Sequence, residues 1–558
     1  MWLARLVTAL AVVPMALMLG EVLRSGRLQH IDYLYQLTRI TNRDGTLKPF
    51  DPTNYLSNEH FLGLPSLIYW VNIQLFAGDN RTLGVFVVAV AAGTVVALGL
   101  ALPRTLPPLL RAGLVVACST LVFSLHGLWN FTRAMSGTAW LTANLLVVVA
   151  LLLAARGRWW PAWVLALLAS LTYGTAFAVW PVLAVLAFVK REPWWRRLVP
   201  LVVGGVIMLV WLGIRSAPPQ AASPSSDPGS LVYYFLAIVG KLWTVADGGI
   251  AAAAGAAILA CYAVLAGART AREPRLWFWW ALAGHAFLGA VLVAVARADY
   301  GEEVGLHTAR YTSVAVLMAV PAIVLMAAVA YQRGDRWMPR IAVLAVVVGV
   351  LGYALGAPYA REERAANKEH FLEAVAIRGG FSDAYRRYPL ASELGPRLRA
   401  LGHYPFTSDF TLGCGGPELG STLDRDEMTP LDAPIGNKRS RDPAGAVDWT
   451  EPAEPAPFFH GKAVPVLHGW AYDRTDPVRC VVIVDGAGEV VGGGVSGVQR
   501  TDVALRYAGV APDAGFAVIG PVDDRSRIVV LYESGAMRWL APEAPPGAED
   551  PDPRLQPR

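Results

Sequence analysis

An acidic residue, Asp32, follows shortly after the long apolar stretch at the N-terminus, in the sequence HIDYLYQLTR. A carboxylate close to the end of such a stretch could act as a general base and take the proton from an acceptor hydroxyl. The same side chain could instead pair with Arg39 or cap a helix, and the local sequence leaves these roles open. Asp32 is therefore a candidate catalytic residue with a competing structural interpretation.

The segment Asn58-Glu59-His60 supplies further polar side chains a short distance along the chain. Glu59 and His60 could bind a sugar or a metal ion. Alternatively, Asn58 is the N-cap of a helix with Glu59 in its first turn, a common helix start that the local sequence favours. Asp51 precedes a proline, which favours a turn or an extended backbone, and we interpret it as structural.

Two arginines flank a later polar segment, ARADYGEEVGLHTARYTS at residues 296–313. Arg297 follows one apolar stretch, and Arg310 and Tyr311 begin the next. Guanidinium groups bind phosphate through paired hydrogen bonds and keep their charge, so this segment could hold a lipid phosphate. Snorkelling arginines and interfacial tyrosines at helix ends explain the pattern equally well.

The segment HGLWNFTRAMSG at residues 126–137 adds Trp129, Asn130 and Arg133. Aromatic and amide side chains suit the faces and hydroxyl groups of a sugar, so Asn130 and Arg133 join the candidate substrate-binding residues. Tryptophan is also common at membrane interfaces, so this segment by itself is only weak support for sugar binding.

The composition of the 558-residue chain indicates that membrane helices must position these residues. Hydrophobic residues make up 54% of the sequence and charged residues 16%, and the mean hydropathy is +0.41. A soluble domain carries about a quarter charged residues, so a string of soluble domains is excluded. Disordered, collagen-like and disulfide-dense chains are excluded as well.

The net charge of +5 is unevenly distributed. Residues 1–357 hold 26 Lys and Arg against 14 Asp and Glu, a net charge of +12. Residues 358–558 hold 22 against 29, a net charge of −7. The positive charge therefore belongs to the apolar part, and an acidic soluble part argues against nucleic-acid binding.

Membrane-spanning helices need about 20 apolar residues. The stretch 159–189 is too long for one straight helix, and basic residues flank both of its ends. This predicts a hairpin of two short helices that turns between Gly174 and Pro181, and a total of about eleven spans. The other expected spans are 2–20, 81–102, 112–128, 138–155, 198–214, 246–268, 276–296, 312–331 and 341–357.

Basic residues concentrate in alternate loops, which the positive-inside rule assigns to the cytoplasm. The N-terminus is then expected in the cytoplasm, and loop 21–80 and the C-terminal tail outside it. Residues 61–78 are apolar enough to suggest another span, but a crossing there would reverse every later loop. We therefore predict a short helix along the membrane surface. Segment 2–20 could also be a cleaved signal peptide.

The tail is expected to contain four parts. Residues 358–402 are predicted to form one helix and two shorter ones, and residues 403–464 an irregular linker. Short strands over 465–541 predict a small antiparallel β-sandwich, and 542–558 are expected to be disordered. The expected fold class is an all-α polytopic membrane domain over residues 1–357, followed by this soluble α+β tail.

The four cysteines divide between the two parts. Cys118 and Cys261 lie inside expected spans, where a small apolar role is the simpler interpretation. Cys414 and Cys480 both lie in the tail, where an oxidising compartment would allow them to pair. The sequence contains no Cys/His spacing typical of a zinc site and no glycine-rich phosphate loop.

Taken together, the membrane part resembles the GT-C superfamily of polyprenyl-phosphate-dependent membrane glycosyltransferases, and more narrowly a group of bacterial multi-pass proteins of that type. The resemblance extends over residues 1–402. That group often has Arg after the motif NEH and an Asp in the following helix, where this chain has Phe61 and Asn72. The matching segments are NEH at 58–60, FSLHGLWNFTRAMSG at 123–137, SLTYGTAFAVWP at 170–181 and residues 296–313.

This resemblance implies inverting sugar transfer from a polyprenyl-phosphate donor to a cell-envelope glycan or lipid acceptor. The reaction would take place on the non-cytoplasmic side of a bacterial inner membrane. Asp32 would be the base, and Arg297 and Arg310 would stabilise the departing lipid phosphate. Some GT-C enzymes use a divalent metal ion and others do not, and both cases stay open here. The candidate substrate-binding residues are Glu59, His60, Asn130, Arg133, Arg297, Arg310 and Tyr311.

The tail motifs resemble a β-sandwich module found in bacterial carbohydrate-active and surface proteins. They are GWAYD at 469–473, VVIVDG at 481–486 and QRTDVA at 499–504, with Thr501 where that module usually has proline. We expect Trp470 to lie in the core of the module and not on a sugar-binding surface.

Two functions compete with a glycosyltransferase. The chain could be a lipid-linked sugar flippase or transporter, or a catalytically inactive, membrane-anchored glycan-binding protein. Carriers tend to place ionisable residues within their spans, near the midplane of the membrane. The spans expected here are nearly free of charge, which favours an enzyme with a surface-facing site.

Overall fold

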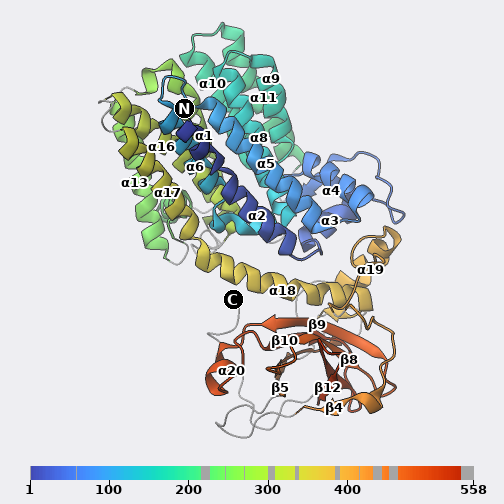
Figure 1. Cartoon of the computed structure of the whole chain (residues 1–558). Helices are drawn as coiled ribbons and strands as arrows, with labels where there is room; N and C mark the ends of the chain where they lie inside the picture. Colours follow the sequence, from blue (N-terminus) through green and yellow to red (C-terminus); the bar gives the residue numbers. More distant parts are fainter. Residues whose placement is uncertain are drawn as a thin grey trace.

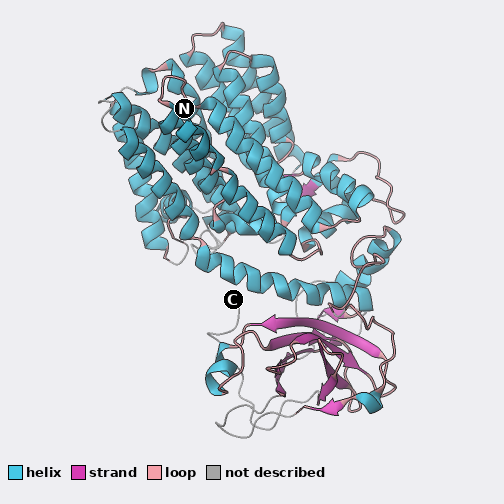
Figure 2. Cartoon of the chain, viewed as in Figure 1, coloured by secondary structure: helices cyan, strands magenta, loops and turns pink. Residues whose placement is uncertain are grey.

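The computed structural model divides the chain into a bundle of apolar helices and a C-terminal β-sheet (Figures 1 and 2). Helix α18 (Ala357–Gly379) lies between the two, across one end of the bundle (Figure 1). The described residues are 2–57, 60–214, 227–244, 247–268, 270–298, 308–332, 338–383, 390–413, 415–431, 443–451 and 463–541.

Within the described residues, nine helices are long and apolar enough to cross a membrane, and they match the nine long spans predicted from the sequence. Their length follows from uninterrupted apolar runs of about 20 residues. They are built from α1 (Trp2–Ala9) with α2 (Val12–Arg24), α5 (Asn80–Ala101), α6 (Pro108–Val122), α8 (Ala134–Ala155), α11 (Trp194–Ile214), α13 (Gly248–Gly267), α14 (Trp277–Arg297), α16 (Thr312–Gln332) and α17 (Met338–Ala354).

The stretch 159–189 forms a pair of short apolar helices, as predicted. They are α9 (Trp159–Ser170) and α10 (Val179–Val189), joined through the 3-10 turn η3 (Gly174–Ala178). The turn therefore begins at Gly174, and the chain has entered α10 by Pro181.

The sequence analysis missed one short apolar helix, α12 (Pro228–Gly240). Its 13 residues are fewer than a straight span needs, so a criterion based on length did not select it. The helix packs closely against α13 because Gly240 lies at the contact. A Cβ atom there would come within 1.9 Å of the carbonyl oxygen of Ala251.

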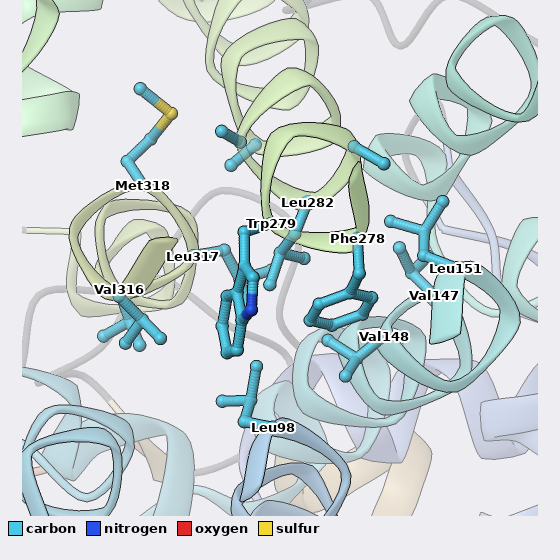
Figure 3. Close-up of a cluster of buried hydrophobic side chains, with 14 of the residues drawn as sticks. Leu98, Val147, Val148, Leu151, Phe278, Trp279, Leu282, Val316, Leu317 and Met318 are labelled. Atoms are coloured by element: carbon cyan, nitrogen blue, oxygen red, sulfur yellow. The ribbon is translucent and has the colours of Figure 1, made fainter. Parts of the chain in front are cut away.

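The centre of the bundle is an apolar core shared by α5, α8, α14 and α16 (Figure 3). Trp279 is fully buried in this core. By contrast, α11 exposes apolar side chains such as Leu209, which is 69% exposed, and Val202, which is 61% exposed. A helix this apolar on its exposed surface would be unfavourable in water and is suited to contact with lipid.

Contacts between loops follow the alternation that the sequence predicts. The Lys190 ammonium donates to the carbonyl oxygens of Ala154 and Ala155, which joins two loops expected on the cytoplasmic side. The amide of Asn130 donates to the carbonyl oxygen of Ala309, which joins two loops expected on the outer side. Each of these contacts therefore joins two loops that the sequence assigns to the same side of the membrane.

The first long loop folds into helices and a small hairpin. It contains α3 (Ile31–Ile40), strands β1 (Leu56–Ser57) and β2 (His60–Phe61), and α4 (Gly63–Phe76). The short helix predicted within 61–78 is present as α4. The N-cap of α4 is Leu62. Asn58, for which the sequence suggested an N-cap role, lies outside the described residues.

The tail forms one continuous eight-stranded sheet, in the order β4-β12-β11-β8-β9-β10-β7-β5. All neighbouring strands are antiparallel except β4 and β12. The strands are β4 (Thr429–Pro430), β5 (Ala444–Glu451), β7 (Val466–Tyr472), β8 (Val478–Val484), β9 (Val490–Val498), β10 (Gly515–Ile519), β11 (Arg527–Tyr532) and β12 (Met537–Leu540). The mainly antiparallel character of the module was predicted. A separate two-stranded parallel sheet pairs β3 (Ser382–Asp383) with β6 (Ala463–Val464).

The stretch 403–464 is not only a linker, because it contributes β4 and β5 to the sheet. The sequence analysis missed β5 because its residues AGAVDWTE show little alternation of apolar and polar side chains. Of the helices expected over 358–402, α18 and α19 (Leu390–Ala400) are described. The predicted disordered segment 542–558 lies outside the described residues.

Two smaller predictions concern the sheet module. Trp470 is 1% exposed and stacks on Tyr507 with ring centroids 5.2 Å apart, which confirms its place in the core. Cys480 is a buried disulfide cysteine on β8, but its expected partner Cys414 lies outside the described residues.

Candidate functional site

Asp32 lies in the first turn of α3, whose N-cap is His30. An acidic residue there interacts favourably with the unsatisfied N–H groups of the helix start. The sequence suggested that Arg39 could pair with Asp32. In the structure the Arg39 guanidinium donates to the backbone carbonyl oxygen of Leu56. Burial raises the pKa of the Asp32 carboxyl above its usual value, and the nearby positive charge of Arg310 lowers it. The structure thus brings Asp32 and Arg310 together from distant parts of the sequence.

Trp129 connects Arg310 to the other polar residues around Asp32. The Arg310 guanidinium lies 5.9 Å from the centre of the Trp129 ring, and the Arg133 guanidinium lies 5.2 Å from it. The His30 ring packs edge-on against the same ring, with centroids 5.6 Å apart. A cation beside an aromatic face is favourable, and the indole brings both guanidinium groups to the N-terminal end of α3.

Asn130, on α7 (Leu128–Thr132), is only 1% exposed, and both ends of its amide contact protein groups. Its nitrogen donates to the carbonyl oxygen of Ala309 at 3.4 Å, and its oxygen accepts from the Ser136 hydroxyl at 2.8 Å. Asn130 therefore connects α8 and the short helix η7 (Ala309–Tyr311) through these hydrogen bonds, and the sugar contact expected from the sequence stays a prediction.

Further positive charge lies near Arg310. Tyr234 of α12 interacts electrostatically with both Arg297 and Arg310. Lys241, at the end of α12, is completely buried and donates to the carbonyl oxygen of Thr308 at 2.7 Å. Its ammonium also lies 5.9 Å from the ring of the buried Tyr311. Two further basic residues therefore lie in the region of Arg310, an arrangement that suits an anionic ligand.

His60 lies at one end of a row of aromatic rings that reaches the same region. Its ring is 4.2 Å from that of Tyr173, Tyr173 is 4.3 Å from Trp140, and Trp140 is 5.7 Å from Tyr311. His60 is therefore connected to Tyr311 through packing. Glu59, the other residue of this candidate pair, lies outside the described residues.

Sequence reasoning did not select Lys241, His30 or Glu363 of α18. Glu363 is 6% exposed and accepts from the Arg133 guanidinium at 3.2 Å. The sequence does contain an indication for Lys241, because it is a single basic residue between two apolar segments. An ionisable residue in such a place is energetically unfavourable and is usually functional. No comparable signal identifies Glu363, because it lies in a helix with many charged residues.

The described residues contain no group of three or more His, Cys, Asp or Glu side chains that could hold a metal ion. The site built from Asp32, Arg310, Arg297 and Lys241 is rich in cations, which are poor neighbours for a metal ion. We therefore derive no step of the chemistry through a metal.

Comparisons with known proteins give one structural similarity. No family model and no curated protein matches the sequence. Among solved structures, the chain is similar to the crystal structure of ArnT from Cupriavidus metallidurans bound to undecaprenyl phosphate. The similarity has a TM-score of 0.40 and 15% sequence identity, and it covers 72% of this chain and 85% of that chain.

Proposed function

We propose that the protein is an integral membrane glycosyltransferase of the GT-C type. It moves a sugar from a polyprenyl-phosphate donor to a glycan or lipid acceptor of the cell envelope. The observation that carries this proposal is that Asp32 and Arg310 interact electrostatically, at the end of the apolar bundle where Arg297 and Lys241 also lie. One carboxylate for a hydroxyl proton and several cations for a phosphate are the groups that such a transfer requires.

In the proposed reaction, the Asp32 carboxylate takes the proton from the acceptor hydroxyl. The acceptor oxygen forms a bond to the anomeric carbon of the sugar, on the side opposite the phosphate. The bond from that carbon to the phosphate oxygen breaks, its electron pair stays on that oxygen, and the configuration inverts. Negative charge grows on the leaving phosphate, and Arg310 and Arg297 stabilise it through charge-assisted hydrogen bonds.

The distribution of basic residues supports an orientation with the N-terminus in the cytoplasm and the site and tail outside it. The loop pair joined by Lys190 is basic, whereas the site lies at the opposite end of the bundle. A lipid donor reaches such a site from the bilayer, and the acceptor reaches it from the envelope side.

The proposed base predicts a pH dependence. Asp32 has to be ionised to accept a proton, so kcat/KM for the donor should fall as the pH falls through the pKa of this carboxyl. Because burial raises that pKa, we expect the midpoint of the acidic limb above the ordinary value of 3.8. In Arg310→Gln the lowering effect of the guanidinium is lost, so the midpoint should move to a higher pH. An acidic limb with the same midpoint in both proteins would contradict the assignment.

A second prediction concerns Lys241. Replacing it with methionine removes a buried positive charge beside Arg310 and should weaken the affinity for polyprenyl phosphate by about tenfold or more. Lys190→Met is the matched control, because Lys190 also donates to backbone carbonyls and lies beside an aromatic ring, but near the opposite end of the bundle. Equal affinities in the two variants, at equal melting temperature, would show that Lys241 is only structural.

A further inference from the structure

Helix α18 contacts the bundle with one face and the sheet with another. Glu363 and His370, two turns apart, are both buried on the bundle side. Their neighbour Lys368 is exposed and donates to the carbonyl oxygen of Gly497 on β9 at 2.5 Å. Leu372 also packs toward the sheet, where a Cβ atom on Gly494 would lie 2.8 Å from it. The tail is therefore connected to the candidate site through this helix.

On the bundle side, α18 completes a small polar cavity. His370 lies near His30, with ring centroids 6.3 Å apart, and both residues line the cavity together with Arg133 and Asn80. Its volume is about 10 Å³, which is close to the space that one water molecule occupies. A sugar or a lipid head group therefore does not fit in this cavity.

A buried ion pair joins Glu363 to the segment that carries Trp129. The Glu363 carboxylate accepts from the Arg133 guanidinium at 3.2 Å and from the Thr132 hydroxyl at 3.4 Å. The side chains of Glu363 and Arg133 are 7% and 15% exposed. An ion pair with so little solvent holds its geometry well, and removal of one partner leaves an uncompensated buried charge.

We propose that Glu363 is a positioning residue of the sugar-transfer site. It fixes the Arg133 guanidinium beside Trp129, and Trp129 in turn supports the Arg310 guanidinium, which interacts electrostatically with Asp32. The first helix of the tail is thereby part of the active site, and the tail is more than an appended module. This inference rests on the proposed function, because it assigns Glu363 a role in holding the groups that bind the donor.

The test uses purified full-length protein with polyprenyl phosphate as the probe and measures both its affinity and the rate of sugar transfer. Glu363→Gln keeps the size of the side chain and removes its charge. We expect it to weaken the affinity for polyprenyl phosphate and to lower kcat/KM by about tenfold, as supporting contacts around a site commonly do. Glu362→Gln is the matched control, because Glu362 is the adjacent residue and is exposed. It should behave as the wild type.

A double variant shows whether Glu363 acts through Arg133. If it does, the variant with both Glu363→Gln and Arg133→Gln should be no weaker than Arg133→Gln alone. Fully additive losses would overturn the proposal, as would a Glu363→Gln protein that binds and transfers like Glu362→Gln. A wild-type protein that neither binds polyprenyl phosphate nor transfers sugar would instead reject the proposed function.

A second substitution keeps the proposal testable if Glu363→Gln does not accumulate. Arg133→Lys retains a positive charge opposite Glu363 but loses the planar guanidinium that lies beside Trp129. We expect it to fold and to lose affinity for polyprenyl phosphate to a similar extent. Wild-type affinity in Arg133→Lys would contradict the positioning role.

Discussion

Replacing Asp32 with asparagine is expected to slow sugar transfer by at least about 100-fold, since a positioned general base contributes rate factors of this size. Asparagine has nearly the same shape but cannot accept the proton of the acceptor hydroxyl. In cells, this variant should lack the transferred sugar in its surface glycans and should accumulate the polyprenyl-phosphate sugar. Comparison of envelope glycans and lipid-linked sugars from mutant and parent cells measures both effects.

The fold should tolerate this substitution well. Burial raises the pKa of the Asp32 carboxyl, so the ionised carboxylate that the reaction requires makes the folded state less stable than a neutral side chain would. A neutral asparagine avoids that cost, and the melting temperature should stay the same or rise. Asp51→Asn is the matched control: Asp51 is an exposed carboxylate of the same loop that accepts from Thr53 in a local turn. Unchanged glycans in Asp32→Asn at equal protein level would reject the catalytic role.

Arg310→Gln is expected to have the second largest effect, a loss of about 100-fold in kcat/KM for the donor. The guanidinium is proposed to bind the lipid phosphate and to stabilise the charge that grows on it as the glycosidic bond breaks. Removing one such preorganised donor typically costs a factor of this size. Transfer assays at several concentrations of the polyprenyl-phosphate sugar separate the effect on KM from the effect on kcat.

The control for this substitution is Arg104→Gln. Arg104 is an exposed arginine in a loop expected on the cytoplasmic side, so loss of its charge should leave transfer unchanged. If Arg310→Gln transfers sugar as fast as Arg104→Gln does, the phosphate site has to lie elsewhere. A flippase would behave differently again, since its transport activity would not depend on the proton acceptor at Asp32.

The helical part of the fold could be predicted because apolar length is decisive for a membrane helix. The hairpin over 159–189 followed from charge at its two ends. Length also explains why the sequence analysis did not predict α12, because this helix has fewer residues than a membrane span needs. The strand β5 was missed because it is stabilised by pairing with β7, a tertiary contact that the local sequence pattern of β5 does not indicate.

The candidate site could be predicted only in part. Asp32 and Arg310 were selected because a carboxylate can accept a proton and a guanidinium can bind phosphate, and because the resemblance to the GT-C superfamily gave them these roles. Their proximity could not be predicted, because it depends on tertiary packing: His30, at the start of α3, and Arg310 of η7 both contact Trp129. The pairing of Arg133 with Glu363 was equally hidden, since 230 positions separate these residues. The type of a residue therefore indicates which chemistry it could perform, and tertiary packing determines which of these residues lie close together.

The most direct test of the central claim is the affinity of the purified full-length protein for polyprenyl phosphate, measured for the wild type, Asp32→Asn and Arg310→Gln. The account predicts that the wild type binds and that Asp32→Asn binds at least as tightly, because a negative charge near the phosphate is gone. Arg310→Gln should bind at least about tenfold more weakly, because a charged hydrogen bond to the phosphate is lost. Equal binding by the wild type and Arg310→Gln, or no binding by any of the three proteins, would contradict the account.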